Sequence, residues 1–143
     1  IFSTRIRRGL ELPLFEDGLE TRDFVHVADV SRALIACILS SEPICDVLNV
    51  GSGIPTSVLS VAEQLMLALG QKVPLLVTAE YRLGDIRHNY ADISRIKKFL
   101  PEFPSVSLSE GLTRFAAWVH DQPLPEDGLE RANAELRVRK LMP

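Results

Sequence analysis

Residues 21–29, with the sequence Thr-Arg-Asp-Phe-Val-His-Val-Ala-Asp, are the stretch around which the rest of the chain can be interpreted. Its middle alternates apolar and polar positions, and its final aspartate precedes an apolar helical pattern. Such alternation is typical of a short strand, and aspartate is a preferred helix N-cap. We therefore predict a strand that leads into a helix over residues 30–40 capped by Asp29, with Arg22 at the start of the strand beside a cavity.

The residues before this stretch predict two short local elements. Phe2 and Ile6 lie one helical turn apart and are followed by Gly9, which is the pattern of a helix that ends at a glycine. Residues 12–15 predict an extended segment and residues 16–18 a turn. This order predicts a hairpin in which the strand of residues 21–29, the central strand, pairs with the segment before the turn.

The residues after it predict a covered sheet and several helices. Residues 47–50 are apolar apart from Asn49, which predicts a strand buried on both faces. Further elements are a strand over residues 73–78 and helices capped by Ser57, by Asp92 and by the capping box of Ser107 and Glu110. Residues 122–143 are polar and predict a helical or disordered tail that adds little to a domain over residues 1–121.

Composition limits the classes of function. The chain has 143 residues, of which 46% are hydrophobic and 24% charged, and its net charge is −3. It has no run of Lys and Arg, which argues against nucleic-acid binding, and no apolar run near the ~18 residues that span a bilayer. Cys37 and Cys45 are interpreted as reduced core thiols of a cytoplasmic protein.

The chain lacks the common cofactor and nucleophile motifs. Gly51, Ser52 and Gly53 are not followed by the third glycine of a dinucleotide fingerprint, so we interpret them as a tight turn. No Gly-x-Ser-x-Gly elbow is present, and no histidine lies at metal-ligand spacing from another histidine or a cysteine. We therefore expect no metal and no cofactor to be bound by motifs of this chain.

Two arginine-bearing segments suit an anionic ligand. A guanidinium binds phosphate oxygens in bidentate fashion, and Arg82 lies three residues before Asp85, whose carboxylate suits ribose hydroxyls. Phe15 follows Pro13 closely and would stack on a base or belong to the core. The alternative for each arginine is a surface ion pair, and composition and spacing alone leave both interpretations open.

Several ordered motifs carry a family resemblance over residues 1–120. They are residues 15–18, 21–30, 48–53, 82–88, 91–94 and 108–118. In this order and spacing they resemble the nucleotide-sugar epimerase/dehydratase branch of the extended short-chain dehydrogenases. The residues of the motifs are similar to those of enzymes like dTDP-L-rhamnose and UDP-glucose 4-epimerases. The resemblance implies an α/β chain that forms the C-terminal substrate-binding part of an extended Rossmann-type epimerase, with the N-terminal dinucleotide-binding domain missing.

The resemblance also implies roles for six residues. They are Arg22 at the diphosphate, Arg82 and Asp85 at phosphate and ribose, Pro13 and Phe15 beside the base, and Asn49 on the strand that lines the same pocket. The implied ligand is a UDP- or dTDP-sugar, and the implied cofactor is NAD, held by the intact enzyme in its N-terminal domain.

The catalytic residues of such an enzyme are expected upstream of Ile1. The family's Tyr-x-x-x-Lys set is absent here, because Tyr81 and Tyr90 are followed four positions later by Asp85 and Ser94. We therefore expect a truncated epimerase or dehydratase that is inactive alone, whose intact form is cytoplasmic and allows a homodimer. The alternative is a truncated or degenerate module that binds nucleotides or partners without catalysis.

Overall fold

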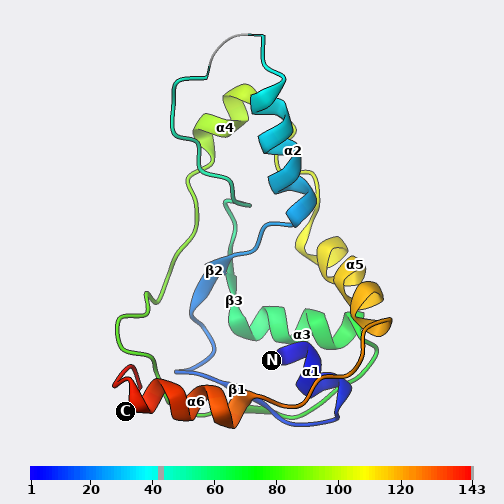
Figure 1. Cartoon of the computed structure of the whole chain (residues 1–143), viewed down its shortest axis with the longest axis vertical. Coiled ribbons are helices and arrows are strands. Elements are labelled where there is room, and N and C mark those ends of the chain that lie inside the picture. The colour runs from blue at the N-terminus through cyan, green and yellow to red at the C-terminus, as the bar shows by residue number, and fades with distance from the viewer. Residues whose placement is uncertain (42–43, 143) are drawn as a thin grey trace.

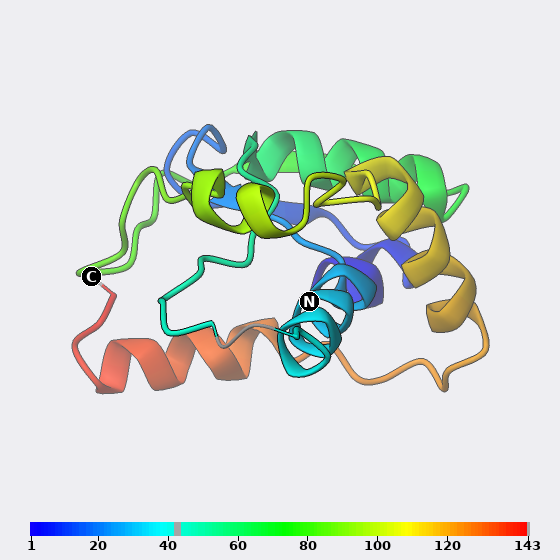
Figure 2. The ribbon, with the colours of Figure 1, turned by 90° about the horizontal axis from the view of Figure 1, so that it is seen from above.

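A computed structural model describes residues 1–41 and 44–142 and shows an elongated arrangement of short strands and helices (Figure 1). Along the chain the elements are α1 (Phe2–Arg7), β1 (Leu12–Leu14), β2 (Thr21–Asp23), α2 (Val27–Ile38), β3 (Pro55–Ser57), α3 (Val58–Ala68), β4 (Leu75–Val77), α4 (Ser94–Phe99), α5 (Leu108–His120) and α6 (Leu129–Val138). In the lower half of the molecule, α3 and α6 lie on opposite sides (Figure 2).

The strands form two separate pairs of distant segments. β1 pairs with β4 in parallel, with Leu12 opposite Leu75. β2 pairs with β3 in antiparallel fashion, with Thr21 opposite Ser57. The predicted hairpin between residues 12–15 and the central strand is therefore wrong, because the turn at residues 16–18 leads the chain from one pair into the other. The central strand is also shorter than predicted and ends at Asp23.

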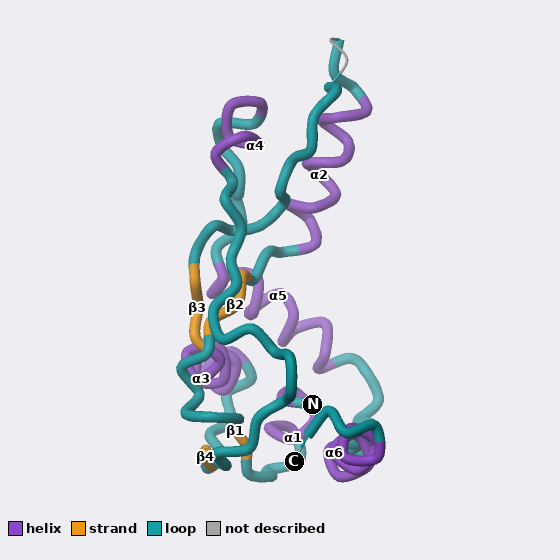
Figure 3. The backbone as a smooth tube through the Cα atoms, turned by 90° about the vertical axis from the view of Figure 1, so that its left-hand side faces the viewer, coloured by secondary structure: helices purple, strands orange, loops and turns teal. Residues whose placement is uncertain are grey.

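The larger core lies where α1, β1 and α3 meet (Figure 3). Its buried members are Ile6, Leu12, Leu14, Ala62, Leu65, Met66 and Val73. The predicted helix before Gly9 is confirmed as α1, and the predicted Ser57 cap is confirmed because its hydroxyl accepts a hydrogen bond from the Ser60 amide at 3.1 Å. The turn before β2 is attached to this core, because the Leu59 amide of α3 donates a hydrogen bond to the Gly18 carbonyl at 3.0 Å.

A second core joins α2 to α4. It consists of the buried residues Ala33, Ile93, Ile96 and Phe103, with Leu48 and Val50 packed against it. The predicted strand over residues 47–50 is wrong: this segment is not a strand, and Val47 is 78% exposed. Within residues 1–41 and 44–142 no strand pairs with it, so it contacts the protein on one side only.

The start of α2 differs from the prediction, and the difference connects α2 to the residues that precede α5. His26, not Asp29, caps the helix, because its Nδ1 accepts a hydrogen bond from the Ala28 amide at 3.1 Å. Asp29 lies in the first turn, is 1% exposed, and accepts hydrogen bonds from the Ser105 amide and hydroxyl and from the Val106 amide. Burial alone would raise the pKa of Asp29, but these hydrogen bonds hold it below its usual value.

The other predicted caps are confirmed only in part. The Ser107 hydroxyl accepts a hydrogen bond from the Glu110 amide at 3.2 Å, whereas the Glu110 carboxylate binds Arg114 instead of completing a capping box. Asp92 accepts a hydrogen bond from the Ser94 amide, although Ile93 occupies the N-cap position of α4. These two helices nevertheless begin within two residues of the predicted caps.

The C-terminal residues contact the fold, although their polarity predicts little contribution to it. Leu129 and Met142 are 7% and 4% exposed. The α6 side chain of Arg137 forms an ion pair with Glu80 at 2.7 Å, and the amide of Leu83 donates a hydrogen bond to the carbonyl of Leu141 at 2.8 Å. The tail therefore packs beside the loop that begins at residue 80.

One face of α2 is apolar and exposed. The side chains that form this α2 face are Leu34, Ile35, Ile38 and Leu39, between 55% and 79% exposed. The two cysteines are free, but Cys37 is half-buried and Cys45 is exposed, so the prediction of core thiols is wrong. No helix in the described ranges is long and apolar enough to cross a membrane.

Candidate functional site

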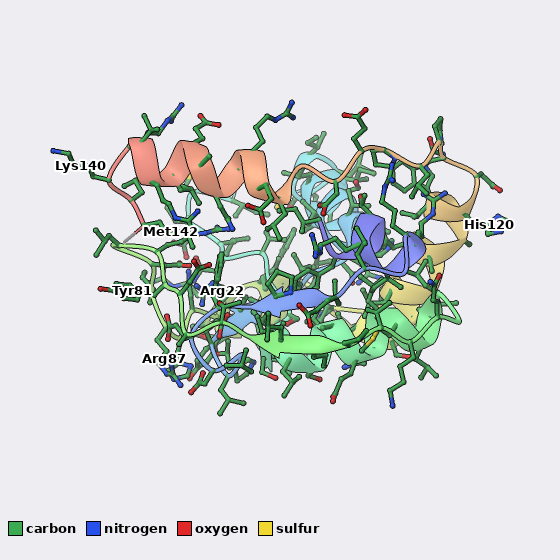
Figure 4. All side chains as sticks on the ribbon, turned by 90° about the horizontal axis from the view of Figure 1, so that it is seen from below. Arg22, Tyr81, Arg87, His120, Lys140 and Met142 are labelled. Atoms are coloured by element: carbon green, nitrogen blue, oxygen red, sulfur yellow. The ribbon has the colours of Figure 1, made fainter. Side chains whose placement is uncertain are left out.

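Five of the six predicted site residues line one pocket of about 240 Å³. This arginine pocket is lined by Ile1, Phe2, Pro13, Phe15, Glu20, Arg22, Val58, Arg82, Asp85 and Leu129. Figure 4 shows Arg22 at the same end of the molecule as Tyr81, Arg87 and Met142, and at the opposite end from His120. The residues come from β1 and the turn after it, from the segment of β2, from the start of α3 and from the loop after β4, with α1 and α6 at the sides.

Arg22 is held at the pocket wall by three hydrogen bonds. Its Nη2 donates to Asp85 Oδ1 at 2.7 Å, and its Nη1 donates to the carbonyls of Thr21 and Arg87 at 2.9 and 3.1 Å. The side chain keeps 27% of its surface exposed. A partly buried, fixed guanidinium of this kind is well placed to bind an anion, because its orientation is set before the ligand arrives.

The loop that carries Asp85 runs beside β2. The Thr21 amide donates to the Arg87 carbonyl at 2.9 Å, and the Asn89 amide donates to the Thr21 carbonyl at 3.1 Å. Arg87 then binds Glu16 and Asp17 at 2.6 Å each, which ties the loop to the turn after β1. The hydrogen bond from Arg87 is the main reason why the pKa of Asp17 lies below its usual value.

Arg82 and Phe15 face each other across the pocket wall. The guanidinium carbon of Arg82 lies 5.0 Å from the centroid of the Phe15 ring, which is the geometry of a cation–π contact. Phe15 is therefore a wall of the pocket, and its place beside a base stays a prediction. Arg22 also forms the ion pair that the alternative interpretation predicts, and its partner Asp85 lies in the same pocket.

Asp23 holds the scaffold behind the pocket. Its carboxylate accepts hydrogen bonds from the amides of Ser52, Gly53 and Ala91 at 2.5, 3.0 and 3.0 Å. Burial alone would raise the pKa of Asp23, but these hydrogen bonds hold it below its usual value. The Asp23 carboxylate can lie close to the backbone of Gly51 because this residue has no side chain. A Cβ at this position would lie 2.6 Å from the Asp23 carboxylate.

The same hydrogen bonds decide whether this turn suits a dinucleotide. A pyrophosphate cradle needs main-chain amides that point at the ligand from the start of a helix. The amides of Ser52 and Gly53 are directed to Asp23, and a strand rather than a helix follows the turn. The residues of this turn therefore do not fit the pyrophosphate of NAD.

Asn49 lies outside the arginine pocket. It lines a neighbouring cavity of about 370 Å³, which Arg22 also lines, together with Asn89 and Tyr90. The Asn49 side-chain amide donates a hydrogen bond to the Asp92 carbonyl at 3.1 Å. Arg22 lines both cavities and thus lies between Asn49 and the other four predicted residues.

Five residues of the pocket lining were not among the predicted site residues: Ile1, Phe2, Glu20, Val58 and Leu129. Leu129 enters from α6, which the polar composition of the tail gave no reason to place there. Glu20 lies two positions before Arg22, and this spacing was a usable signal, because alternate residues of an extended segment share a face. Within the described ranges, no group of three or more His, Cys, Asp and Glu side chains could hold a metal ion.

A larger apolar cavity of about 440 Å³ lies between the start of α2 and α5. Its walls include Phe24, His26, Phe115 and Trp118. The arginine on this wall, Arg114, is already paired with Glu110 at 2.6 Å. The lining of this cavity is mostly apolar, whereas the arginine pocket has the charged groups that a phosphorylated ligand requires.

The sequence and the fold are both similar to known sugar-nucleotide enzymes. Residues 1–51 match the model of the NAD dependent epimerase/dehydratase family. The chain is 34% identical over 119 residues to dTDP-L-rhamnose 4-epimerase of Burkholderia thailandensis, covering 83% of this chain and 32% of that enzyme. UDP-glucose 4-epimerase of Thermotoga maritima, solved with UDP-glucose, aligns with a TM-score of 0.71 and 31% identity over 83% of this chain and 38% of its own.

A further solved structure is UDP-glucuronic acid 4-epimerase of Bacillus cereus in complex with UDP-glucuronic acid and NAD. It aligns with a TM-score of 0.67 and 27% identity, covering 81% of this chain and 38% of its own. The arrangement of strands and helices defines this chain as a mixed α/β unit of the extended short-chain dehydrogenase type.

The chain belongs to the NAD dependent epimerase/dehydratase family, which confirms the resemblance found in its motifs. It spans between 32% and 37% of the length of three curated relatives that it matches.

Proposed function

We propose that this chain binds the nucleotide part of a UDP- or dTDP-sugar for an NAD-dependent epimerase or dehydratase. The observation that carries the proposal is the convergence of Pro13, Phe15, Arg22, Arg82 and Asp85 on one pocket. These residues come from segments up to 72 positions apart in sequence, from Pro13 to Asp85. Two guanidiniums, an aromatic ring and a carboxylate are the groups that a nucleoside diphosphate requires.

Each residue has a distinct role in this proposal. Arg22 and Arg82 bind the diphosphate, and Phe15 and Pro13 flank the base. Asp85 lies at the ribose and also orients Arg22. Binding energy gained at the nucleotide positions the sugar for reaction elsewhere, so this part of the protein contributes orientation rather than bond making. Asn49 extends the site through the cavity that it shares with Arg22.

The reaction itself is assigned to a dinucleotide-binding domain outside this chain. NAD, when bound by that domain, supplies the transient oxidation of the sugar. The α2 face and the exposed residue Val47 support the proposal, because exposed apolar surface of this extent marks an interaction site. A cytoplasmic location and a homodimer of the intact enzyme are parts of the same proposal.

Ligand binding and turnover by the 143-residue chain test this function. Isothermal titration with UDP-glucose and with dTDP-glucose is expected to show saturable binding of at least one of them. An assay for sugar epimerisation with added NAD is expected to show no turnover. Absence of binding to either nucleotide sugar would refute the binding role, and measurable turnover would refute the assignment of catalysis to another domain.

The second candidate is a module that binds nucleotides or partners without taking part in catalysis. Its supporting observation is that the chain forms two cores and the arginine pocket from its own residues. The two candidates differ in whether another domain covers the α2 face in the intact protein. Strong fluorescence of a hydrophobic dye favours a face made for a missing domain, whereas weak fluorescence favours an autonomous module.

A further inference from the structure

α6 and the residues that follow it, 129–142, form one side of the arginine pocket, and we call them the α6 strap. Leu129, at the start of α6, is buried and lines the pocket. The chain beyond α6 contacts the loop that carries Arg82 and Asp85. The family motifs end at residue 118, so this side of the pocket consists of residues that no motif includes.

Two contacts attach the α6 strap to the loop after β4. The Arg137 guanidinium forms an ion pair with Glu80 at 2.7 Å, and the Leu83 amide donates a hydrogen bond to the Leu141 carbonyl at 2.8 Å. Residues 80 and 83 lie on either side of Arg82 in the sequence. The strap therefore holds the part of the loop that carries a guanidinium of the pocket.

The turn after α6 makes the second of these contacts possible. Lys140 has a φ of +57°, a left-handed conformation that favours glycine over residues with a side chain. The Leu141 amide donates a hydrogen bond to the Leu136 carbonyl at 2.9 Å, which closes the turn at the end of the helix. The turn brings the Leu141 carbonyl to Leu83 and buries Met142. Strained residues of this kind gather at ligand clamps and switch regions.

The α6 strap can detach while both cores stay folded. Among the described residues, neither core includes a residue of α6. The side chains of Arg137 and Glu80 are 46% and 37% exposed, so water competes for both charges of the ion pair. Segments with few buried apolar contacts open at a small part of the free energy that global unfolding requires.

The size of the pocket requires one wall to move. Its volume is about 240 Å³, whereas sites that enclose a small organic ligand usually measure about 300–1,000 Å³. α1, β1 and α3 belong to the larger core, and β2 is paired with β3. The α6 strap and the loop that it holds are therefore the walls that can open for a nucleoside diphosphate.

We propose that the α6 strap opens to admit the nucleotide and closes again behind it, with the turn at Lys140 holding it closed. The proposal rests on the proposed function, because it needs a nucleotide in the arginine pocket. A lid limits the rates at which a ligand enters and leaves, since both steps pass through the open state. A loosened strap is therefore expected to speed association and dissociation alike.

Substitution of Lys140 tests the turn. The Lys140 side chain is exposed and points away from the molecule (Figure 4), so its removal changes the backbone rather than the packing. Lys140→Pro cannot form the turn, because proline fixes φ near about −65°. Lys140→Gly loses the same charge but keeps the turn, because glycine adopts a positive φ without strain.

Surface plasmon resonance with UDP measures both rates on the 143-residue chain. Lys140→Pro is expected to raise the association rate and the dissociation rate by about two- to tenfold each, the ratio that corresponds to one lost hydrogen bond. Lys140→Gly is expected to exchange UDP no faster than the unaltered chain. Circular dichroism melting checks that both variants fold.

A charge exchange tests the ion pair. Arg137→Glu is expected to speed exchange of UDP, because it places two acids opposite each other, and the added change Glu80→Arg is expected to restore the original rates. Arg139→Glu is the control and is expected to leave the rates unchanged, because Arg139 pairs with Glu135 inside α6 and not with the loop.

Equal rates in Lys140→Pro and Lys140→Gly overturn the proposal and leave the proposed function intact. A change in only one of the two rates also overturns it, because a lid acts on entry and exit alike. If the unaltered chain binds no UDP, the proposed function fails and the proposal fails with it.

Discussion

Replacing Arg22 with alanine is expected to weaken nucleotide binding while leaving the fold almost unchanged. The side chain provides a fixed guanidinium at the wall of the arginine pocket. Hydrogen bonds to charged groups contribute about 1.5–3 kcal/mol each. Losing one such contact with the diphosphate therefore raises the dissociation constant for UDP by roughly 10- to 150-fold.

The structure predicts a small effect of the same substitution on stability. The ion pair between Arg22 and Asp85 leaves 27% and 47% of the two side chains exposed, and pairs of this kind contribute about 0–1 kcal/mol. The carbonyls of Thr21 and Arg87 keep other donors, because they also bind the amides of Asn89 and Thr21. Neither carbonyl is left unsatisfied by the substitution.

Isothermal titration with UDP measures the effect, and Arg95→Ala is the matched control. Arg95 also loses one positive charge and one ion pair, with Asp46 at 2.8 Å, but it is not part of the arginine pocket. Its affinity for UDP is expected to stay within about twofold of that of the unaltered chain. If Arg22→Ala binds UDP as well as Arg95→Ala does, while both melt normally, Arg22 is not a diphosphate ligand.

Three further predictions concern the scaffold. Gly51→Ala is expected to cost about 1–3 kcal/mol in the free energy of unfolding, because its Cβ would lie 2.6 Å from the Asp23 carboxylate; Gly128→Ala, with open space around it, is the control. The pKa of Asp29 lies below 3.8, so its hydrogen bonds stabilise the fold fully above that pH and are lost as the pH falls through the native pKa. Acid titration of stability should therefore be flatter in Asp29→Asn, and an unchanged pH dependence would contradict this role. Ile38, 79% exposed on the α2 face, is expected to contribute to dye binding, so Ile38→Lys should lower dye fluorescence at unchanged melting temperature; equal fluorescence would argue against that face.

Local patterns predicted the helices better than the strand pairing. Ser57 and Ser107 cap helices as expected, because capping depends on residues that are close in sequence. The pairing of β1 with β4 joins Leu12 to Leu75, and nothing near either residue encodes this partner. Asp29 resembles a cap in sequence, but its carboxylate is used by Ser105, a contact that only the folded chain reveals.

Most residues of the candidate site could be predicted from the sequence, but not all of their positions in the structure. The resemblance to a family of known enzymes gave the residues Arg22, Arg82 and Asp85, and the structure gathers them in one pocket. Asn49 lines the neighbouring cavity, on a segment that joins neither sheet in the described ranges. Glu20 was missed because no motif includes it, although its spacing from Arg22 places it on the same face.

The two faces of the segment from Glu20 to Asp23 make different contacts. Glu20 and Arg22 line the pocket, whereas the Asp23 carboxylate binds the amides of residues 52, 53 and 91. Substituting Glu20 leaves the three hydrogen bonds of Asp23 in place, whereas substituting Arg22 also removes its own hydrogen bonds to Asp85 and to the Arg87 carbonyl. The pocket-facing position Glu20 can therefore vary independently of Asp23, which binds the amides of two other loops.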